Sequence, residues 1–258
     1  MKISILQTDI QWADILANHA NAARLIGEAE KSDLYVLPEM WSTGFATEPQ
    51  GIAEDEEGVS LRWMRMMARE KDAALCGSVA VQTANGEYRN RLYFVFPDGE
   101  YSYYDKHHLF TYGHEDQFYT AGDSRTIVSY RGVRFLLATC YDTRFPLWLR
   151  YNDDYDAIII VANWPANRQM AWRTLTRARA IENQCHVIAA NRTGVDPYLE
   201  YNGESAIIDA YGNTLAQACA DGQQTVTAVL DMERQQHFRQ KFPVLRERDR
   251  LASPLPWE

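Results

Sequence analysis

Short apolar runs alternate along the chain with segments whose apolar residues recur at helical spacing. Residues 3–10 indicate a first strand, residues 14–31 a helix, and residues 34–37 a second strand. A helix of this length between two strands makes a βαβ unit. We therefore expect the two strands to be parallel and adjacent or nearly so.

The same patterns continue through the rest of the chain. Asn85-Gly86 lies between two apolar runs, which is a strong hairpin signal. Ser60 and Asp231 stand at the start of periodic segments, so we expect them to be helix N-caps. By these signals, helices are expected over 60–71, 171–182 and 232–241, and further strands over 74–82, 91–96, 101–105, 157–161, 186–191, 205–208 and 225–230.

One apolar run, beginning at Val133, ends in a thiol that charged residues follow. A glycine turn and a polar break bound it, which is typical of a strand buried on both faces, with Cys140 as its last residue. Pro146 cannot join a strand ladder and suits the first turn of a helix. We therefore expect a sharp turn after Cys140 and a helix from near Pro146. Backbone N–H groups at such a turn favour negative charge, which would lower the pKa of the thiol.

The two halves of the chain resemble each other in organisation. Each has βαβ character plus hairpin strands, which would let two sheets pack face to face with helices outside. No linker rich in Pro, Gly or Ser divides them. We therefore predict a single domain over residues 1–241. We expect residues 242–258, which show little periodicity, to form an extended tail that packs on the domain or on a partner subunit.

Composition excludes several classes of protein. Of the 258 residues, 46% are hydrophobic and 24% charged, which is typical of a globular chain. A net charge of -9 without clustered Lys and Arg argues against nucleic-acid binding. No apolar window approaches the length of a membrane span, and the N-terminal residues lack the features of a signal peptide. Four scattered cysteines fit a reducing cytoplasm better than a disulfide framework or a zinc site.

Polar residues with catalytic chemistry follow three of the predicted strands. A carboxylate (Glu39), an ammonium (Lys106) and a thiol (Cys140) stand, in this order, at strand ends. Ligands of α/β sheets gather beyond the carboxyl ends of strands, so these groups are expected where chemistry occurs. Cys76 and Cys185 lie instead in apolar segments that keep a thiol protonated and inert.

The segments around these residues read Leu-Pro-Glu39-Met-Trp, Tyr-Asp-Lys106-His-His-Leu-Phe and Ala-Thr-Cys140-Tyr-Asp-Thr-Arg-Phe-Pro. In this order they resemble the three signatures of the nitrilase (carbon-nitrogen hydrolase) superfamily. The resemblance extends from the first strand to about residue 230. It implies an α/β fold, a four-layer αββα sandwich of two mixed sheets with helices on the outer faces. It also implies a homodimer or higher homo-oligomer.

The resemblance further implies a Glu-Lys-Cys triad that needs no cofactor and no metal. In that reaction Cys140 attacks an amide carbonyl while Glu39 accepts the thiol proton. Lys106 favours the thiolate and, with the backbone N–H of Tyr141, stabilises the oxyanion. Many family members carry a second glutamate after the lysine, and Glu115, nine positions beyond Lys106 (115 − 106 = 9), matches it. A solvated loop acid is the alternative interpretation of Glu115.

Other polar and aromatic residues near the motifs are expected to line a pocket or to support it. Asp142 and Arg144 are interpreted as charges that pair with neighbours to fix the turn after Cys140. Adjacent side chains in an extended segment point to opposite faces, so His107 and His108 are expected to be structural. The candidates for substrate binding are Trp41, Phe45, Asn163, Trp164 and Arg168, and each of them has core packing or a solvated surface as its alternative role.

The wording of the motifs, with Asn163-Trp164-Pro165 and Ala-Arg-Ala-Ile-Glu-Asn at 178–183, looks most like the bacterial ω-amidase branch. That resemblance implies release of ammonia from the terminal amide of 2-oxoglutaramate or 2-oxosuccinamate through a thioester. Arg168 is the candidate cation for the carboxylate of such a substrate. An N-carbamoyl amine hydrolase or a short aliphatic amidase is the nearest alternative. A thiol redox sensor or a non-catalytic scaffold is the alternative from another class.

Overall fold

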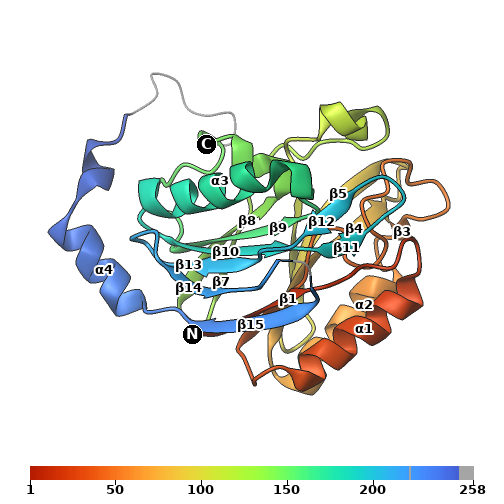
Figure 1. Ribbon diagram of the computed structural model, residues 1–258, viewed down its shortest axis with the longest axis horizontal. Helices are drawn as coiled ribbons and strands as arrows, with labels where there is room; N and C mark the ends of the chain where they lie inside the picture. The colour runs from red at the N-terminus through yellow and green to blue at the C-terminus, as the bar shows by residue number, and fades with distance from the viewer. Residues whose placement is uncertain (221, 250–258) are drawn as a thin grey trace.

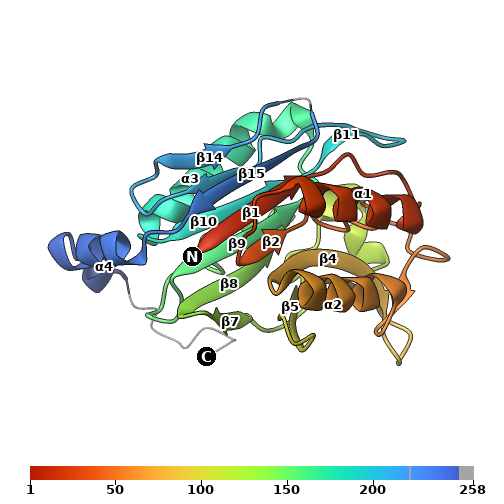
Figure 2. The ribbon, with the colours of Figure 1, turned by 90° about the horizontal axis from the view of Figure 1, so that it is seen from below.

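The structure is a computed structural model, and it describes residues 1–220 and 222–249. Two sheets pack face to face, with helices on their outer faces (Figures 1 and 2). The predicted αββα sandwich is therefore confirmed. None of the described helices is long and apolar enough to cross a membrane.

The first sheet has seven strands and contains the predicted βαβ unit. Its first two strands in the chain are parallel neighbours, as expected, because the helix between them returns the chain to the same edge. The order is β15 (Gln224–Val229), β1 (Lys2–Gln7), β2 (Leu34–Val36), β4 (Ala74–Gln82), β5 (Tyr88–Val95) and β6 (Tyr101–Asp105), with β3 (Glu54–Asp55) paired to β4.

The second sheet has six strands and carries the strand that ends at the thiol. Its order is β14 (Thr214–Gln217), β13 (Ala206–Ile208), β10 (His186–Asn191), β9 (Ala157–Ala162), β8 (Val133–Thr139) and β7 (Ile127–Tyr130). A separate hairpin pairs β11 (Thr193–Val195) with β12 (Glu200–Asn202). Strands β3, β7, β11, β12 and β14 were not predicted, because each is too short to show a clear period.

Helices cover the outer face of each sheet. The helices α1 (Ile15–Glu28) and α2 (Val59–Lys71) cover the first sheet, and α3 (Gln169–Glu182) covers the second. The helix α4 (Met232–Lys241) projects from the end of the sandwich (Figure 1). Asp231 caps α4, as predicted, through a hydrogen bond from the N–H of Arg234.

The sequence predicted Ser60 as the N-cap of α2, and this prediction is wrong. The N-cap is Gly58, and Ser60 lies inside the first turn. The buried carboxylate of Glu54 takes the capping role. It accepts a hydrogen bond of 2.6 Å from the backbone N–H of Ser60 and another from the Ser60 hydroxyl.

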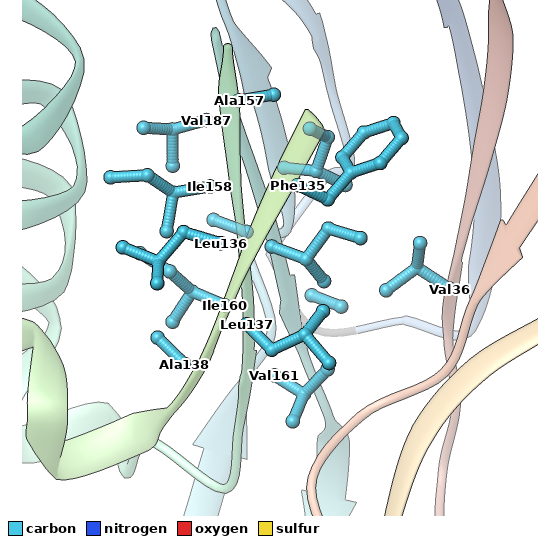
Figure 3. Packing of buried hydrophobic residues seen from close by; sticks show 14 of the residues in the cluster. Val36, Phe135, Leu136, Leu137, Ala138, Ala157, Ile158, Ile160, Val161 and Val187 are labelled. Atoms are coloured by element: carbon cyan, nitrogen blue, oxygen red, sulfur yellow. The ribbon is translucent and has the colours of Figure 1, made fainter. Parts of the chain in front are cut away.

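The alternating side chains of the central strands fill two layers of core. Figure 3 shows Leu136 and Ile158 pointing toward a helix, and Phe135 and Leu137 pointing toward Val36 of the other sheet. All five side chains are fully buried. Each such burial contributes about 1.5–3 kcal/mol, so this core fixes the positions of the strand ends that carry the site.

The predicted C-terminal tail is only partly described. Residues Val244–Glu247 form a short 3-10 helix, so this part of the chain is not extended. Leu245 packs against the main core. Residues 250–258, which include Trp257, lie outside the described residues.

Candidate active site

The carboxyl ends of β2 and β6 bring a carboxylate and an ammonium together. Glu39 lies three residues beyond β2, and Lys106 directly follows β6. The Lys106 Nζ is 2.9 Å from Glu39 Oε1 and 2.8 Å from Glu115 Oε2. All three side chains are fully buried. The loop acid Glu115 is therefore part of the site and is not a solvated surface group.

Glu39 is held from the second sheet as well as from the first. Its Oε2 accepts a hydrogen bond of 2.8 Å from the backbone N–H of Asn163, which follows β9. The side-chain amide of Asn163 donates to the backbone carbonyl of Glu39 at 2.6 Å. These bonds link the two sheets and fix the carboxylate in one orientation.

Cys140 directly follows β8, at a strained backbone position. Its φ is 45°, in the left-handed region that a residue with a side chain adopts at a cost of about 1–3 kcal/mol. The expected helix near Pro146 is absent. A 3-10 helix covers Cys140–Arg144 instead, because the chain turns at the thiol itself. The N–H groups of its first residues have no carbonyl partner within the turn.

Asp142 holds this turn in place, as the sequence suggested. Its carboxylate accepts hydrogen bonds from the backbone N–H groups of Thr139 and His108, each at 2.9 Å, and from the Tyr104 hydroxyl at 2.8 Å. His107 stacks on Trp148 with ring centroids 3.7 Å apart. His107 and His108 therefore pack around the turn.

Lys106 favours the thiolate of Cys140, as expected, but other groups outweigh it. Burial, followed by the negative charge of Glu39, raises the pKa of Cys140 well above its usual value. Lys106 acts in the opposite direction, but its charge is shared with two carboxylates. The thiol is therefore protonated at neutral pH and needs a base.

The charged groups behind the thiol shift one another's pKa values. Burial opposes the charge of Lys106, but the carboxylates of Glu115 and Glu39 outweigh burial and raise the pKa of the ammonium. Burial, and to a smaller extent the charge of Glu39, raises the pKa of Glu115 against the opposing effect of Lys106. Lys106 is therefore a permanent cation.

Cys140 opens onto a cavity of about 250 Å³. Phe45, Asn163, Trp164 and Arg168 lie in its wall, where the sequence placed them. The wall is largely aromatic and belongs to several loops beyond the strand ends. The remaining lining residues are Thr47, Phe110, Gly113, Tyr141, Arg144, Pro165, Asp196, Tyr198, Leu199 and Tyr201.

Trp41 does not line this cavity, in contrast to the expectation. It is buried on the other face of the first sheet, in the cluster beneath α1 and α2. Its ring lies 5.1 Å from that of His19 and 4.9 Å from that of Trp63. The backbone of Met40 is in the left-handed region, with a φ of 41°. The side chain of Trp41 therefore does not share the face of the sheet on which Glu39 lies.

Arg144 lines the cavity instead of fixing the turn. Its guanidinium lies 4.8 Å from the centre of the Trp164 ring. Arg168 lies 5.1 Å from the rings of both Phe110 and Tyr112. Among the described residues, neither arginine forms an ion pair with a carboxylate. The cavity wall therefore carries two cations that pair with no carboxylate in the described part of the chain. Asp196, a carboxylate of the same wall, accepts hydrogen bonds from the Tyr201 hydroxyl and from two backbone N–H groups.

Sequence reasoning missed Asn90, whose side chain contacts both glutamates of the site. Asn90 lies within β5 but just before the strand predicted over residues 91–96, so the sequence pattern gave no signal that pointed to it. Within the described part of the chain there is no group of three or more His, Cys, Asp or Glu residues arranged to hold a metal ion.

Known proteins match this chain in sequence. The family model for carbon-nitrogen hydrolases matches residues 2–240. The omega-amidase YafV of Yersinia enterocolitica is 41% identical over 252 residues, which cover 97% of this chain and 98% of that protein. A 2-oxoglutaramate amidase of Bacillus subtilis is 36% identical over 248 residues, which cover 94% of this chain and 95% of that protein.

A solved structure matches the fold. The protein XC1258 of Xanthomonas campestris superposes with a TM-score of 0.94 at 38% identity, over 98% of each chain. It is described as a CN-hydrolase superfamily protein with an arsenic adduct in its active site.

Proposed function

Because the chain belongs to the carbon-nitrogen hydrolase family and is an amide-hydrolysing enzyme, we propose that Cys140 is the nucleophile of an ω-amidase reaction. The substrate is the terminal amide of a small 2-oxo dicarboxylic acid monoamide, 2-oxoglutaramate or 2-oxosuccinamate. The observation that carries this proposal is a thiol in the wall of a cavity that Arg144 and Arg168 also line, close to the buried pair of Glu39 and Lys106.

The first half of the reaction acylates the enzyme. Glu39 takes the proton of the Cys140 thiol as the sulfur attacks the amide carbonyl, so the thiolate forms only during attack. This order fits a thiol whose pKa is raised by burial and by the Glu39 charge. Lys106 and the backbone N–H of Tyr141 stabilise the oxyanion. Glu39 then returns the proton to nitrogen, the C–N bond breaks, and ammonia leaves.

The second half regenerates the thiol. Glu39 accepts a proton from water as the water oxygen attacks the thioester carbonyl and a second oxyanion forms. The C–S bond then breaks, and Glu39 returns this proton to the sulfur of Cys140. The products are the dicarboxylic acid and the free thiol. Glu115 acts through Lys106, because its carboxylate contacts the ammonium at 2.8 Å and orients it.

The two arginines of the cavity support the choice of substrate. A guanidinium favours a carboxylate because its donors match the two oxygens. Arg144 and Arg168 both line the cavity, and both stack on aromatic rings that limit their motion. The relatives named for omega-amidase and 2-oxoglutaramate amidase activity lend the same support. A neutral aliphatic amide would leave both cations without a partner.

Steady-state kinetics on matched substrates test the proposal. We expect 2-oxoglutaramate to be hydrolysed with a much higher kcat/KM than pentanamide, which has the same chain length but no carboxylate. Replacing Arg168 or Arg144 with Ala raises KM for 2-oxoglutaramate more than for pentanamide, because only the charged substrate loses an ion pair. Equal losses on both substrates would exclude the arginine from carboxylate binding. A preference of the unmodified enzyme for neutral or carbamoyl amides would contradict the substrate assignment.

We also propose that the enzyme acts in the cytoplasm as a homodimer or higher homo-oligomer. Exposed apolar side chains near α3 and α4 support an interface between subunits. They include Ile181, Tyr211, Leu215, Val229 and Phe242.

A further inference from the structure

A single buried amide contacts both glutamates of the site. Asn90, on β5, is 1% exposed and donates through Nδ2 to Glu39 Oε1 at 2.8 Å and to Glu115 Oε1 at 3.1 Å. The ammonium of Lys106 contacts the same two oxygens, at 2.9 and 3.1 Å. Two donors, one charged and one neutral, therefore hold these two carboxylate oxygens.

The orientation of the Asn90 amide is fixed by a chain of hydrogen bonds. The backbone N–H of Met40 donates to Ser78 Oγ at 2.8 Å. The hydroxyl hydrogen of Ser78 is then left for Asn90 Oδ1, at 2.9 Å. Because Oδ1 faces Ser78, the NH₂ group faces the carboxylates, with one N–H for each.

The backbone of Asn90 contributes to the same arrangement. Its carbonyl accepts a hydrogen bond of 3.0 Å from the N–H of Lys106. One residue therefore sets the position of the lysine backbone and of both carboxylates. Asn90 does not line the cavity, so it is separated from the substrate.

We propose that Asn90 is a positioning residue, which holds Glu39 and Glu115 aligned so that Glu39 receives the thiol proton. This inference rests on the proposed function of Glu39 as the base. An amide suits this position because it donates two hydrogen bonds without adding charge. A carboxylate here would add a third negative charge, and a cation would compete with Lys106 for its partners.

The titratable and charged groups that face Glu39 come from several elements. They are Lys106, Glu115 and Cys140, together with the buried hydroxyls of Tyr119 and Tyr201. Among them Lys106 is the cation. Without the two amide donors, Lys106 is the remaining donor to the two Oε1 atoms, while the backbone N–H groups of Asn163 and Phe110 still contact the Oε2 atoms. The negative charges are then less well stabilised, so the acid limb of the variant is expected at higher pH.

The test is the pH profile of kcat/KM for ammonia release from 2-oxoglutaramate. We expect Asn90→Leu to move the acid limb upward by about one pH unit, the effect of losing a donor to a carboxylate. We expect kcat to fall at least about tenfold, the effect expected of a lost proton-transfer geometry, while KM changes little. Ser78→Ala, which frees the amide to rotate, shifts the limb in the same direction by less.

Asn183→Leu is the matched control. Asn183 is also fully buried and hydrogen-bonded, to the carbonyl of Arg179 and the N–H of Tyr151, but it lies at the end of α3. This variant is expected to lose stability without a shift of the acid limb. An unshifted limb in both Asn90→Leu and Ser78→Ala would overturn the inference. If Asn90→Leu fails to fold, Ser78→Ala decides alone.

The proposed function and this inference fail in different ways. Turnover of 2-oxoglutaramate that survives in Cys140→Ala contradicts the proposed function. An inactive Cys140→Ala together with unshifted Asn90→Leu and Ser78→Ala profiles contradicts only the role of Asn90.

Discussion

Replacement of Lys106 with Met tests the charge balance of the site without any substrate. The ammonium contacts Glu39 and Glu115, and all three side chains are fully buried. Met has a similar length but no charge, so both carboxylates lose their ionic partner. Breaking a buried ion pair costs about 3–5 kcal/mol, because a charge is left without compensation. Proteins of this kind have about 5–15 kcal/mol of total stability, so the loss is easily measured.

The loss should depend on pH, and its sign follows from the carboxylates. The pKa of Glu115 in the folded protein is already raised, first by burial, and without Lys106 it rises further. The folded state then holds a proton that the unfolded state has released. Stability therefore falls as pH rises through the range between the unfolded and the folded pKa of Glu115. The slope is about 1.4 kcal/mol per pH unit for one proton.

Urea denaturation followed by circular dichroism at pH 5 and pH 8 measures both effects. We expect Lys106→Met to lose about 3–5 kcal/mol at pH 8 and distinctly less at pH 5. Lys71→Met is the control, because Lys71 pairs with Glu70 on the surface and should change stability by less than about 0.5 kcal/mol. A loss below about 1 kcal/mol at pH 8, or equal losses at both pH values, would refute the reasoning.

Three further outcomes are expected. The alkylation rate of Cys140 by iodoacetamide, followed by mass spectrometry of the peptide that contains Cys140, should still increase above pH 9, because burial raises the pKa of the thiol. A plateau below pH 7 would reveal a stable thiolate. Ile158→Ala removes a fully buried side chain between β9 and α3. It should lower the free energy of unfolding by about 2–5 kcal/mol, and a change below about 1 kcal/mol would contradict the observed packing. Light scattering should give a mass of at least twice the 29.7 kDa of one chain, and a monomer at micromolar concentration would contradict the proposed oligomer.

Much of the fold was predictable because the long central strands have unambiguous patterns. The apolar run before Cys140, and the helix between β1 and β2, have enough residues to show a period. The three motifs could be placed at strand ends for this reason. Short strands such as β7 and β14 have only four residues each, too few for a pattern to distinguish them from loops.

The orientation of side chains in irregular segments was harder to predict. Glu39 and Trp41 would share one face of an extended strand, but the left-handed backbone of Met40 separates them. Arg144 was expected to fix the turn after Cys140. Its observed position over the Trp164 ring could not be predicted, because Trp164 lies far from Arg144 in the sequence. The pKa of Cys140 depends first on its burial and then on the charge of Glu39, and sequence spacing determines neither.

The most direct test of the central claim is mass spectrometry of the enzyme mixed with 2-oxoglutaramate and quenched early. The account predicts an adduct on the peptide that contains Cys140, with the mass of the substrate less ammonia. In parallel, Cys140→Ala should carry no adduct and release no ammonia. An adduct on another residue, or ammonia release that persists in Cys140→Ala, would contradict the account.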